Sequence, residues 1–305
     1  MGEKETVWDV VCIGQAVLDC IVRGREENPH RKRVYRAESI TLNTGGDAVN
    51  ESIVLAGLGR RVRLVCGLGD DPAGRLILDE VRRRGVDTEK VTVSGKLCTP
   101  VANLMVEKNG SRSSVNSSAT MLEGYTPEAE VVKEARVVSL ASLFRAPLDQ
   151  REVICDLVRA AKAEGAIVCA DTKLPTWRQV DLRDLEEVLP LIDYLFPNEN
   201  EGAYYTGEKE YRARARRICE MGVKHVVIKA GEKGCVACAG GECFEMGSRA
   251  VQAVDSTGAG DSFVAGFISA LLDGRSFYEC CERGTDCAAR CVRQVGTTAW
   301  LEEMP

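Results

Sequence analysis

The stretch that decides the fold reads Val254-Asp255-Ser256-Thr257-Gly258-Ala259-Gly260-Asp261-Ser262-Phe263. Its small residues predict a turn, and a helix should follow at once, because Phe263, Phe267 and Leu271 recur at helical spacing. Glycines let a ligand approach the backbone, and the first turn of a helix presents unpaired N–H groups at the positive end of its dipole. The stretch therefore predicts an anion site, and phosphate is an anion that such sites bind.

Asp261 is the residue that an anion site alone does not explain, since a carboxylate repels phosphate. Its presence makes sense if it takes a proton from a substrate hydroxyl while the backbone amides hold the charge of the phosphoryl group in transfer. The alternative is an ordinary helix N-terminus with an acidic residue in its first turn. The ten residues by themselves leave both interpretations open.

Length and charge narrow the class of protein. A chain of 305 residues can bury a large core, either as one α/β domain or as two smaller ones. Its net charge of -6 gives no reason to expect a nucleic acid or an anionic membrane as a partner. The sequence has no apolar run of about 18 residues, and its first residues do not form a secretion signal. We expect a cytoplasmic protein that binds neither membranes nor nucleic acids.

The fourteen cysteines are scattered through apolar runs such as 10–13, where cysteine behaves as a small buried hydrophobic residue. Because no export signal is present, we expect no disulfides. Cys235, Cys238 and Cys243 have a spacing that resembles a metal site, but the same segment also predicts two short strands around 239–241. Since the chain has two histidines and no second Cys-x-x-Cys pair, we expect packing rather than zinc binding.

From residue 134 onward the sequence alternates between strand and helix patterns. Including two earlier strands, the predicted strands are 7–13, 63–69, 137–140, 166–171, 194–196 and 225–229, and the predicted helices of this part are 150–163, 185–189 and 212–221. The alternation indicates a mostly parallel sheet with helices on both faces, a three-layer α/β/α fold. Ligands of such sheets bind beyond the carboxyl ends of the strands. The residues that follow predicted strands, and would gather there, are Gly14, Gly69, Asp171, Asn198 and Gly231.

Two early segments, about 19–44 and 96–118, do not fit this alternation. Both are β-prone, and Lys108-Asn109-Gly110 predicts a hairpin within the second. We expect the two segments to form a small β-sheet that lies beside the main sheet as a lid. The chain has no repeat, linker or low-complexity segment, so residues 1–305 are interpreted as a single domain.

Several strings, in a fixed order, carry a resemblance to a known family. They are Gly45-Gly46 with Asn50, Leu55-Ala56-Gly57-Leu58-Gly59, Gly69-Asp70-Asp71 with Gly74, Asn198-Glu199-Asn200-Glu201, Lys229-Ala230-Gly231-Glu232-Lys233-Gly234 and the block 255–261. In these strings the chain resembles the ribokinase-like (PfkB) carbohydrate kinases over nearly its whole length, and it looks closest to fructokinase-like and uncharacterised sugar kinases. The resemblance implies the ribokinase-like fold and transfer of the γ-phosphate of MgATP to a sugar hydroxyl.

The resemblance also implies roles for residues on the catalytic and nucleotide side. Asp261 matches the family's general base, and the matches to its anion hole are Gly258, Ala259 and Gly260. Asn198 and Glu201 match an element that organises phosphates and magnesium, with Glu201 acting on Mg²⁺ through water. The other nucleotide-side matches are Lys229, Gly231, Gly234, Thr257 and Asp286. Without the family, Asn198 would simply cap a helix, and Lys229 would be a solvated lysine at a strand end.

On the sugar side, the resemblance implies substrate contacts from Asp261 and from Asp19, Gly45, Gly46, Asn50 and Asn103. A carboxylate and an amide suit a polyol, because they offer both acceptors and donors. Alternatively, Asp19 is a turn residue and Asn50 is a helix-start residue. Asp255 and Thr257 match a monovalent-cation site of the family, which implies K⁺ as an activator. Family members with an extended β lid often pair through it, so we expect a homodimer.

Departures from the family pattern leave the sugar unidentified. Asp47 stands where a Lys or Ser is expected, and Asp171-Thr172-Lys173 replaces the Asp-x-Asn pattern of fructokinases. Asp286 stands where many members carry an Asn near the adenine, and 139–145 lacks the Glu of ribokinases. The sequence therefore predicts only a monosaccharide, sugar acid or polyol with a primary hydroxyl.

Functions other than that of a sugar kinase are compatible with parts of this pattern. A nucleoside or vitamin kinase would share the fold, and a phosphosugar kinase would need a basic pocket, for which Arg112 and Arg145 are the candidates. A sugar sensor would bind without turnover, although Asp261 and the anion loop argue against it. An NAD-dependent dehydrogenase is excluded, because Gly14 is followed by Gln15-Ala16-Val17 rather than by a GxGxxG sequence.

Overall fold

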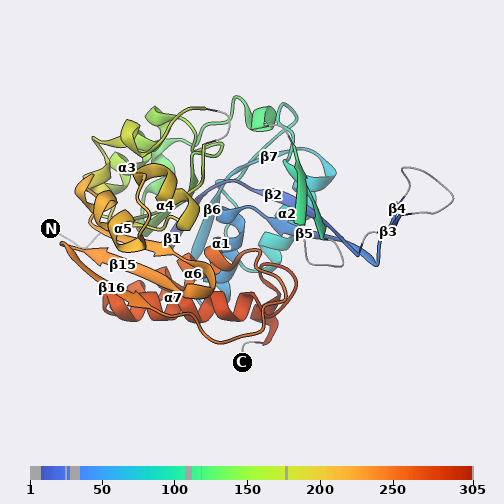
Figure 1. Ribbon diagram of the computed structural model, residues 1–305. Helices are drawn as coiled ribbons and strands as arrows, with labels where there is room; N and C mark the ends of the chain where they lie inside the picture. Colours follow the sequence, from blue (N-terminus) through green and yellow to red (C-terminus); the bar gives the residue numbers. More distant parts are fainter. Residues whose placement is uncertain are drawn as a thin grey trace.

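The computed structural model describes residues 8–24, 26–27, 35–106, 112–117, 119–175 and 178–303 (Figure 1). A large sheet runs through the molecule, helices cover both of its faces, and a smaller sheet lies to one side. This arrangement confirms the predicted three-layer α/β fold with a second, smaller sheet. The predicted turn Lys108-Asn109-Gly110 lies outside the described residues.

The main sheet has eight strands in the order β16-β15-β14-β13-β12-β11-β1-β6. They are β1 (Trp8–Gly14), β6 (Val62–Val65), β11 (Ala135–Leu143), β12 (Ile167–Thr172), β13 (Tyr194–Leu195), β14 (His225–Lys229), β15 (Cys235–Ala239) and β16 (Glu242–Met246). The strands from β6 to β14 pair in parallel, whereas β14, β15 and β16 pair antiparallel. Since parallel strands end at the same edge, segments far apart in the sequence meet there.

Strand β1 illustrates why the sheet is covered on both faces. Its residues Val10, Val11, Cys12 and Ile13 are all fully buried. Val10 and Cys12 belong to one apolar cluster, and Val11 and Ile13 belong to another, because successive side chains of a strand point to opposite faces. A continuous apolar run is thus satisfied only by two layers of helices.

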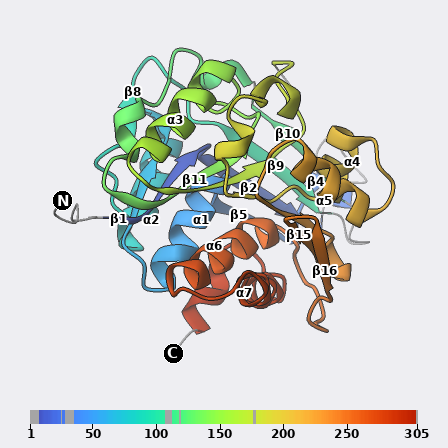
Figure 2. The same cartoon turned by 90° about the vertical axis from the view of Figure 1, so that its left-hand side faces the viewer.

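Those layers are seven helices. They are α1 (Asp47–Gly57), α2 (Pro72–Arg83), α3 (Arg151–Ala163), α4 (Glu199–Thr206), α5 (Tyr211–Glu220), α6 (Ala259–Leu272) and α7 (Phe277–Cys291) among the described residues. Apolar residues of α1, α2, α6 and α7 pack into the first cluster, and those of α3, α4 and α5 pack into the second. Figure 2 shows α1, α6 and α7 on one side of the sheet and α3 on the other.

The smaller sheet comes from the two early segments. Its order is β10-β9-β2-β5, with β2 (Val17–Arg23), β5 (Ser39–Gly45), β9 (Val101–Val106) and β10 (Arg112–Asn116). Strands β9 and β10 form the predicted antiparallel pair. Two short pairs complete the strands, β3 (Glu26–Glu27) with β4 (Tyr35–Arg36) and β7 (Gly67–Gly69) with β8 (Thr92–Ser94). A lid function and the single-domain interpretation stay predictions.

Two predicted elements differ from the structure. The strand expected at 63–69 is divided, because β6 joins the main sheet while β7 pairs with β8. A Cβ at Gly67 would lie 2.7 Å from the Tyr125 ring, so the glycine at the start of β7 leaves room for that ring. The helix expected at 185–189 is replaced by two 3-10 turns, η3 (Leu182–Leu185) and η4 (Leu189–Leu191), and Pro190 cannot continue an α-helix. Four further 3-10 turns are η1 (Ala119–Leu122), η2 (Ala129–Val132), η5 (Gly231–Lys233) and η6 (Ala299–Glu303).

The expectation of no disulfides is wrong at one pair. Cys238 and Cys243 are bonded across the β15–β16 hairpin, where their Cα atoms are 4.1 Å apart. The antiparallel register sets the two residues directly opposite each other, and directly opposed pairs are the closest in a sheet. Cys235 instead lies opposite Met246 and is buried, so the three cysteines do not converge on one point. The prediction that this segment forms two short strands is confirmed.

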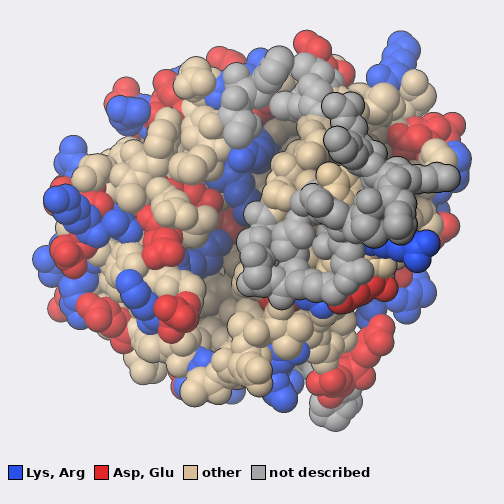
Figure 3. Space-filling model, turned by 45° about the vertical axis from the view of Figure 1, so that its right-hand side comes forward, with Lys and Arg blue, Asp and Glu red and all other residues tan. Residues whose placement is uncertain are grey.

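Within the described part of the chain, no helix is both long and apolar enough to cross a bilayer. On the face drawn in Figure 3, acidic and basic side chains are interspersed over the surface.

Candidate active site

The carboxyl ends of β1, β11, β12 and β14 meet the first turns of α1 and α6 at one edge of the main sheet. Gly258 is the N-cap of α6 and has a φ of 76°, a left-handed conformation that favours glycine. Asp261 follows in the first turn of α6, and only 6% of it is exposed. The quoted stretch thus forms a helix start at the sheet edge where ligands of this architecture bind.

Asp261 is held by a chain of hydrogen bonds. Asn50 Nδ2 donates to Asp261 Oδ2 at 2.7 Å, and Thr297 Oγ1 donates to Asn50 Oδ1 at 2.9 Å. Asn50 is buried in α1, so two helices distant in sequence fix the orientation of the carboxylate. The structure brings Asn50 and Asp261, both assigned to the substrate from the sequence, next to each other, and the Asn50 side chain contacts the carboxylate and Thr297.

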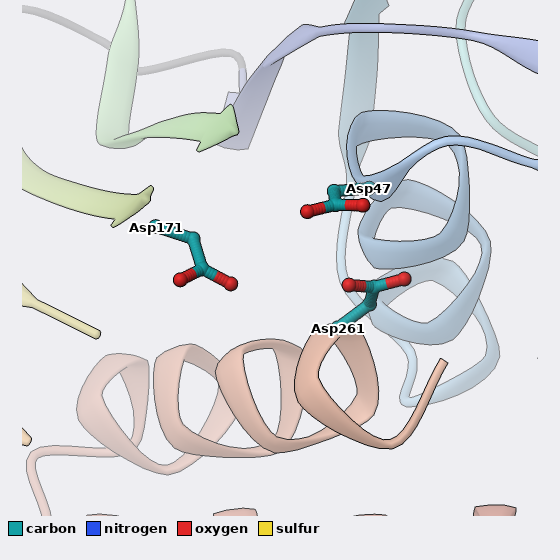
Figure 4. Close-up of side chains that lie close together, drawn as sticks. All are labelled: Asp47, Asp171 and Asp261. Atoms are coloured by element: carbon teal, nitrogen blue, oxygen red, sulfur yellow. The ribbon is translucent and has the colours of Figure 1, made fainter. Parts of the chain in front are cut away.

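Three carboxylates lie close together at this edge (Figure 4). Asp47 comes from the first turn of α1, Asp171 from the end of β12 and Asp261 from α6. One oxygen atom from each lies within 4.8 Å of the other two. Two lysines offset this negative charge. Lys173 Nζ lies 2.7 Å from Asp47 Oδ2, and Lys229 Nζ lies 2.5 Å from Asp171 Oδ2.

The surroundings of Asp261 suit a proton acceptor. Burial and the charge of Asp47 raise the pKa of Asp261 to about 7, while Lys173 and the hydrogen bond from Asn50 pull it down. A base is most effective when its pKa lies near the working pH, so this carboxylate can accept a proton and release it again near neutrality.

Glu51, a residue not predicted from the sequence, lies one turn after Asp47 and is fully buried. Ser139 Oγ donates to Glu51 Oε2 at 2.5 Å. Burial raises the pKa of Glu51 well above its usual range, and the charges of Asp171 and Asp261 act in the same direction. This shift favours the neutral form of Glu51 beneath the three aspartates. In the sequence it looks like any glutamate of an amphipathic helix.

A cavity of about 640 Å³ lies between β14, the 248–260 segment and α7, next to the first turn of α6. Of the predicted nucleotide residues, four line it: Lys229, Gly231, Gly234 and Gly260. Its apolar wall includes Phe263, Val251, Ala288, Ala289 and Val292. The volume and the apolar wall fit a nucleoside, with the start of α6 at the phosphate end.

Lys229 reaches this phosphate end as a cation. Burial opposes its charge, but Asp171 and Glu201 outweigh that effect and hold the pKa of Lys229 above its usual range. A Cβ at Gly260 would lie 3.3 Å from Lys229 Nζ, so the glycine leaves the ammonium room against the helix start.

Asp286 is placed differently from expectation. It is not among the residues that line the cavity, and it pairs instead with Arg249, whose Nε lies 2.5 Å from Asp286 Oδ1. Arg249 does line the cavity. Asp286 faces away because Thr285, Ala288 and Ala289 form the cavity-facing stripe of α7.

Asn198 and Glu201 form a capping box at the start of α4. The Asn198 side chain accepts from the backbone of Glu201, and both oxygens of Glu201 accept from Asn198, at 2.6 and 2.8 Å. Thr172 Oγ1 also donates to Glu201 Oε2 at 3.0 Å. These contacts hold the buried carboxylate in place, and its action on Mg²⁺ through water stays a prediction.

The sugar-side residues are placed unevenly. Asp19 is buried on β2, and a Cβ on Gly45 would lie 2.3 Å from Asp19 Oδ2, so the glycine makes room for this carboxylate. Burial, with the charges of Asp255 and Asp47, raises the pKa of Asp19 to about 6. Gly46 has a φ of 88° and its Cβ position lies 2.4 Å from the Gln15 carbonyl oxygen, which no side chain tolerates.

Asn103 is the predicted substrate residue that the structure does not bring to the others. The β2–β9 register sets Asn103 beside Cys20, whereas Asp19 is beside Ala102. Since neighbouring residues on a strand point to opposite faces, Asn103 lies on the other face of the small sheet from Asp19, and it is exposed.

Asp255 ties the anion loop together. Thr257 donates to Asp255 Oδ1 from its backbone at 3.0 Å and from its hydroxyl at 2.7 Å, and Gly296 N donates to Asp255 Oδ2 at 3.3 Å. Asp255 and Thr257 also line a small cavity of about 220 Å³ against Ile21 and Leu104 of the small sheet. This contact places the loop next to the same sheet face as Asp19.

Comparison with known proteins agrees with this arrangement. The chain matches the model of the pfkB family carbohydrate kinases over residues 8–304. It is 29% identical over 262 residues to a ribokinase of Haemophilus influenzae, covering 83% of this chain and 82% of that protein. An uncharacterized sugar kinase of Archaeoglobus fulgidus is 28% identical over 253 residues, covering 81% of this chain and 97% of that protein.

Among solved structures, that of Arabidopsis thaliana ribokinase complexed with ribose and ATP superposes with a TM-score of 0.80 and 26% identity. The alignment covers 98% of this chain and 96% of that one. A family match over almost the whole chain, together with the same fold in a solved relative, confirms the resemblance. The chain belongs to the pfkB family of carbohydrate kinases, which are sugar-phosphorylating enzymes.

Proposed function

We propose that this enzyme transfers the γ-phosphate of MgATP to a primary hydroxyl of a monosaccharide or sugar derivative, with Asp261 as the general base. The single observation that carries the proposal is the position of Asp261. It is buried, it is oriented by Asn50, it has a pKa of about 7, and it lies in the first turn of α6 next to Gly260, which lines the 640 Å³ cavity. A proton acceptor and a phosphate cradle thus share one turn of α6.

The chain's own residues supply each step of this chemistry. Asp261 would hold the acceptor hydroxyl and take its proton as the oxygen attacks phosphorus. The N–H groups of Gly260 and Asp261 precede the first α-helical hydrogen bond, which Ser262 N donates to Gly258 O at 2.8 Å. They, and Lys229, are therefore suited to the negative charge that the phosphoryl group carries during transfer.

The cavity fits ATP, and the Arabidopsis relative was solved with ribose and ATP. When bound, Mg²⁺ neutralises the phosphates and orients them. Oxygen ligands suit Mg²⁺, and Glu201, already hydrogen-bonded at both oxygens, would act on it through water. A K⁺ site at Asp255 and Thr257, a homodimer and a cytoplasmic location stay predictions from the sequence.

The test is ADP release over a panel of sugars, polyols and sugar acids, with nucleosides and pyridoxal included as acceptors of the near alternative. Asp261→Asn should lower kcat by roughly 10²–10⁴-fold, because an amide cannot take the proton. Asp79→Asn, which changes an exposed aspartate of α2, is the control. Undiminished turnover in Asp261→Asn would refute the assigned role. Sugar binding without any turnover would favour a sensor instead.

A further inference from the structure

Two departures from the family pattern meet in space. Asp47 is the first residue of α1, and Lys173 directly follows the end of β12, yet their side chains form an ion pair at 2.7 Å. The Asp47 side chain is 15% exposed and that of Lys173 is 33% exposed, so the pair is largely but not wholly covered. The ion pair therefore joins two segments that are distant in the sequence at a partly covered position.

The pair borders the position of the acceptor hydroxyl. Oxygen atoms of Asp47 and Asp261 lie within 4.8 Å of each other, and Figure 4 shows the two carboxylates facing across the gap between α1 and α6. A hydroxyl held by Asp261 therefore has Asp47 within reach of its neighbouring substituents. Figure 3 shows basic and acidic side chains side by side in the furrow of the face that it draws.

The charges around this position favour an uncharged acceptor. Besides Asp47 and Asp261, two further carboxylates, those of Asp19 and Asp255, are buried nearby. Burial, followed by the charges of Asp255 and Asp47, raises the pKa of Asp19 to about 6. Among the described residues, the nearby lysines already have carboxylate partners, Lys173 on Asp47 and Lys229 on Asp171. An anionic acceptor would have to take Lys173 from Asp47 and leave that carboxylate unpaired in a covered site, which is costly.

Arg145 is a further cation near this position, and the charge of Asp47 acts on it, but the aspartates around the position still outnumber the cations. Its side chain is half-buried beside the site, and its Nη1 donates to the carbonyl oxygen of Leu174. That bond directs the guanidinium to the backbone just after Lys173. Arg112, the other basic candidate for a phosphosugar pocket, has no described side chain.

We propose that the Asp47–Lys173 ion pair determines acceptor specificity, selecting an uncharged polyhydroxy sugar or polyol and rejecting sugar acids and sugar phosphates. The carboxylate offers acceptors and the ammonium offers donors, so adjacent hydroxyls can bridge the two groups without separating them. This inference rests on the proposed function and narrows its substrate class, which the sequence left open between neutral sugars and sugar acids.

Substitutions of Asp47 and of Lys173 should have different effects on acceptor preference. Asp47→Asn keeps the side-chain shape but removes the charge that holds Lys173, and the released ammonium would then favour a carboxylate on the acceptor. Lys173→Met removes the cation and leaves the acidic groups, so it should weaken all acceptors and bring no gain for sugar acids. Only the first variant should therefore acquire a new preference.

The experiment compares matched acceptors that differ by one group, sorbitol with gluconate and ribitol with ribonate, together with ribose, fructose and fructose 6-phosphate. The readout is kcat/KM for each acceptor in the wild type, Asp47→Asn, Lys173→Met and the double variant. The wild type should prefer the neutral member of a pair at least 10-fold. Asp47→Asn should lower that ratio at least 10-fold, and the double variant should lose the change.

The outcomes separate the two proposals. A wild type that phosphorylates an acid or phosphate better than its neutral counterpart overturns this inference and leaves the proposed kinase activity standing. An unchanged ratio in Asp47→Asn, with the melting temperature preserved, also overturns it. Asp47→Ser repeats the loss of charge if the asparagine variant folds poorly. No ADP release with any acceptor would remove the proposed function, and this inference with it.

Discussion

The nucleotide side and the acceptor side of this site consist of different kinds of chemical groups. The nucleotide side consists largely of glycines, backbone amides and apolar wall residues, and its predicted glycines, Gly231, Gly234 and Gly260, come from two short strings. The acceptor side consists of charged side chains, including Asp19, Asp47 and Lys173, which come from different segments. Phosphate is a constant part of the reaction, whereas the acceptor differs between members of the family.

This difference decides what a sequence can reveal. A glycine-rich string carries its own geometry, because the backbone conformation it permits is local. The role of a charged side chain depends on the partner that the fold places beside it. Substitutions that strain the backbone should therefore reduce activity most on the nucleotide side. Substitutions that change a charge on the acceptor side should alter acceptor preference without abolishing activity.

The largest effect on the free energy of unfolding is expected from Gly258→Ala. Residue 258 has a φ of 76°, and a Cβ there would lie 2.6 Å from Thr297 Cβ. The strained backbone and the clash should lower the free energy of unfolding by about 2–4 kcal/mol. Because Thr297 supports Asn50 and hence Asp261, kcat should also fall by roughly 10²-fold. Urea unfolding and steady-state kinetics measure the two effects.

The control lies at the other end of the same helix. Gly274 has a φ of 71°, but its Cβ position is open, with nothing within 4 Å. Gly274→Ala should cost about 1 kcal/mol from the backbone alone and leave kcat unchanged. Equal losses of activity in the two variants would contradict a special role for the start of α6.

The sequence predicted most of the fold because its signals were local. The strand–helix alternation after residue 134 and the paired strands of the two early segments were both found in the structure. The helix expected at 185–189 was wrong, since apolar spacing there competes with Pro190. The disulfide was missed because the opposition of Cys238 and Cys243 depends on hairpin register.

The next largest effect on the free energy of unfolding is expected at Asp261, because burying its charge destabilises the fold. The pKa of Asp261 is about 7 in the folded protein, whereas the ordinary value for an aspartate is 3.8, so ionisation disfavours the fold increasingly between these values and fully above pH 7. Asp261→Asn should therefore raise the free energy of unfolding by about 2 kcal/mol at pH 8, even though it lowers kcat.

Chemical denaturation of wild type and Asp261→Asn at pH 4 and pH 8 provides the measurement. The stabilisation should be present at pH 8 and small at pH 4, where the wild-type carboxyl is also uncharged. Asp79→Asn, at an exposed position, should change neither value. A destabilised Asp261→Asn at pH 8 would mean that Asp261 contributes to the fold more as a hydrogen-bond acceptor than it costs as a buried charge.

On the acceptor side, the sequence indicated individual residues but not the contacts between them. Asp47 and Lys173 were noticed as departures, but the ion pair between them depends on α1 and β12 meeting at one edge. Asn103 was assigned to the substrate, yet the register of β2 and β9 turns it to the other sheet face from Asp19. Glu51 carried no signal, because burial, rather than residue type, sets it apart.

The smallest effect is a shift of the pH profile, and it separates the two members of the ion pair. The acidic limb of kcat/KM should follow the ionisation of Asp261, whose charged neighbours are Asp47 on α1, Asp171 on β12 and Lys173. Asp47 raises the pKa of Asp261, so Asp47→Asn should move the limb to lower pH, and Lys173→Met should move it to higher pH, each by about half to one unit.

Lys224→Met is the control, because Lys224 pairs with Asp193 at 2.7 Å just before β14, at the opposite edge of the sheet from Asp261. Shifts in the same direction for Asp47→Asn and Lys173→Met would mean that shape, not charge, governs the base, and the contrast between the two sides of the site would lose its physical basis.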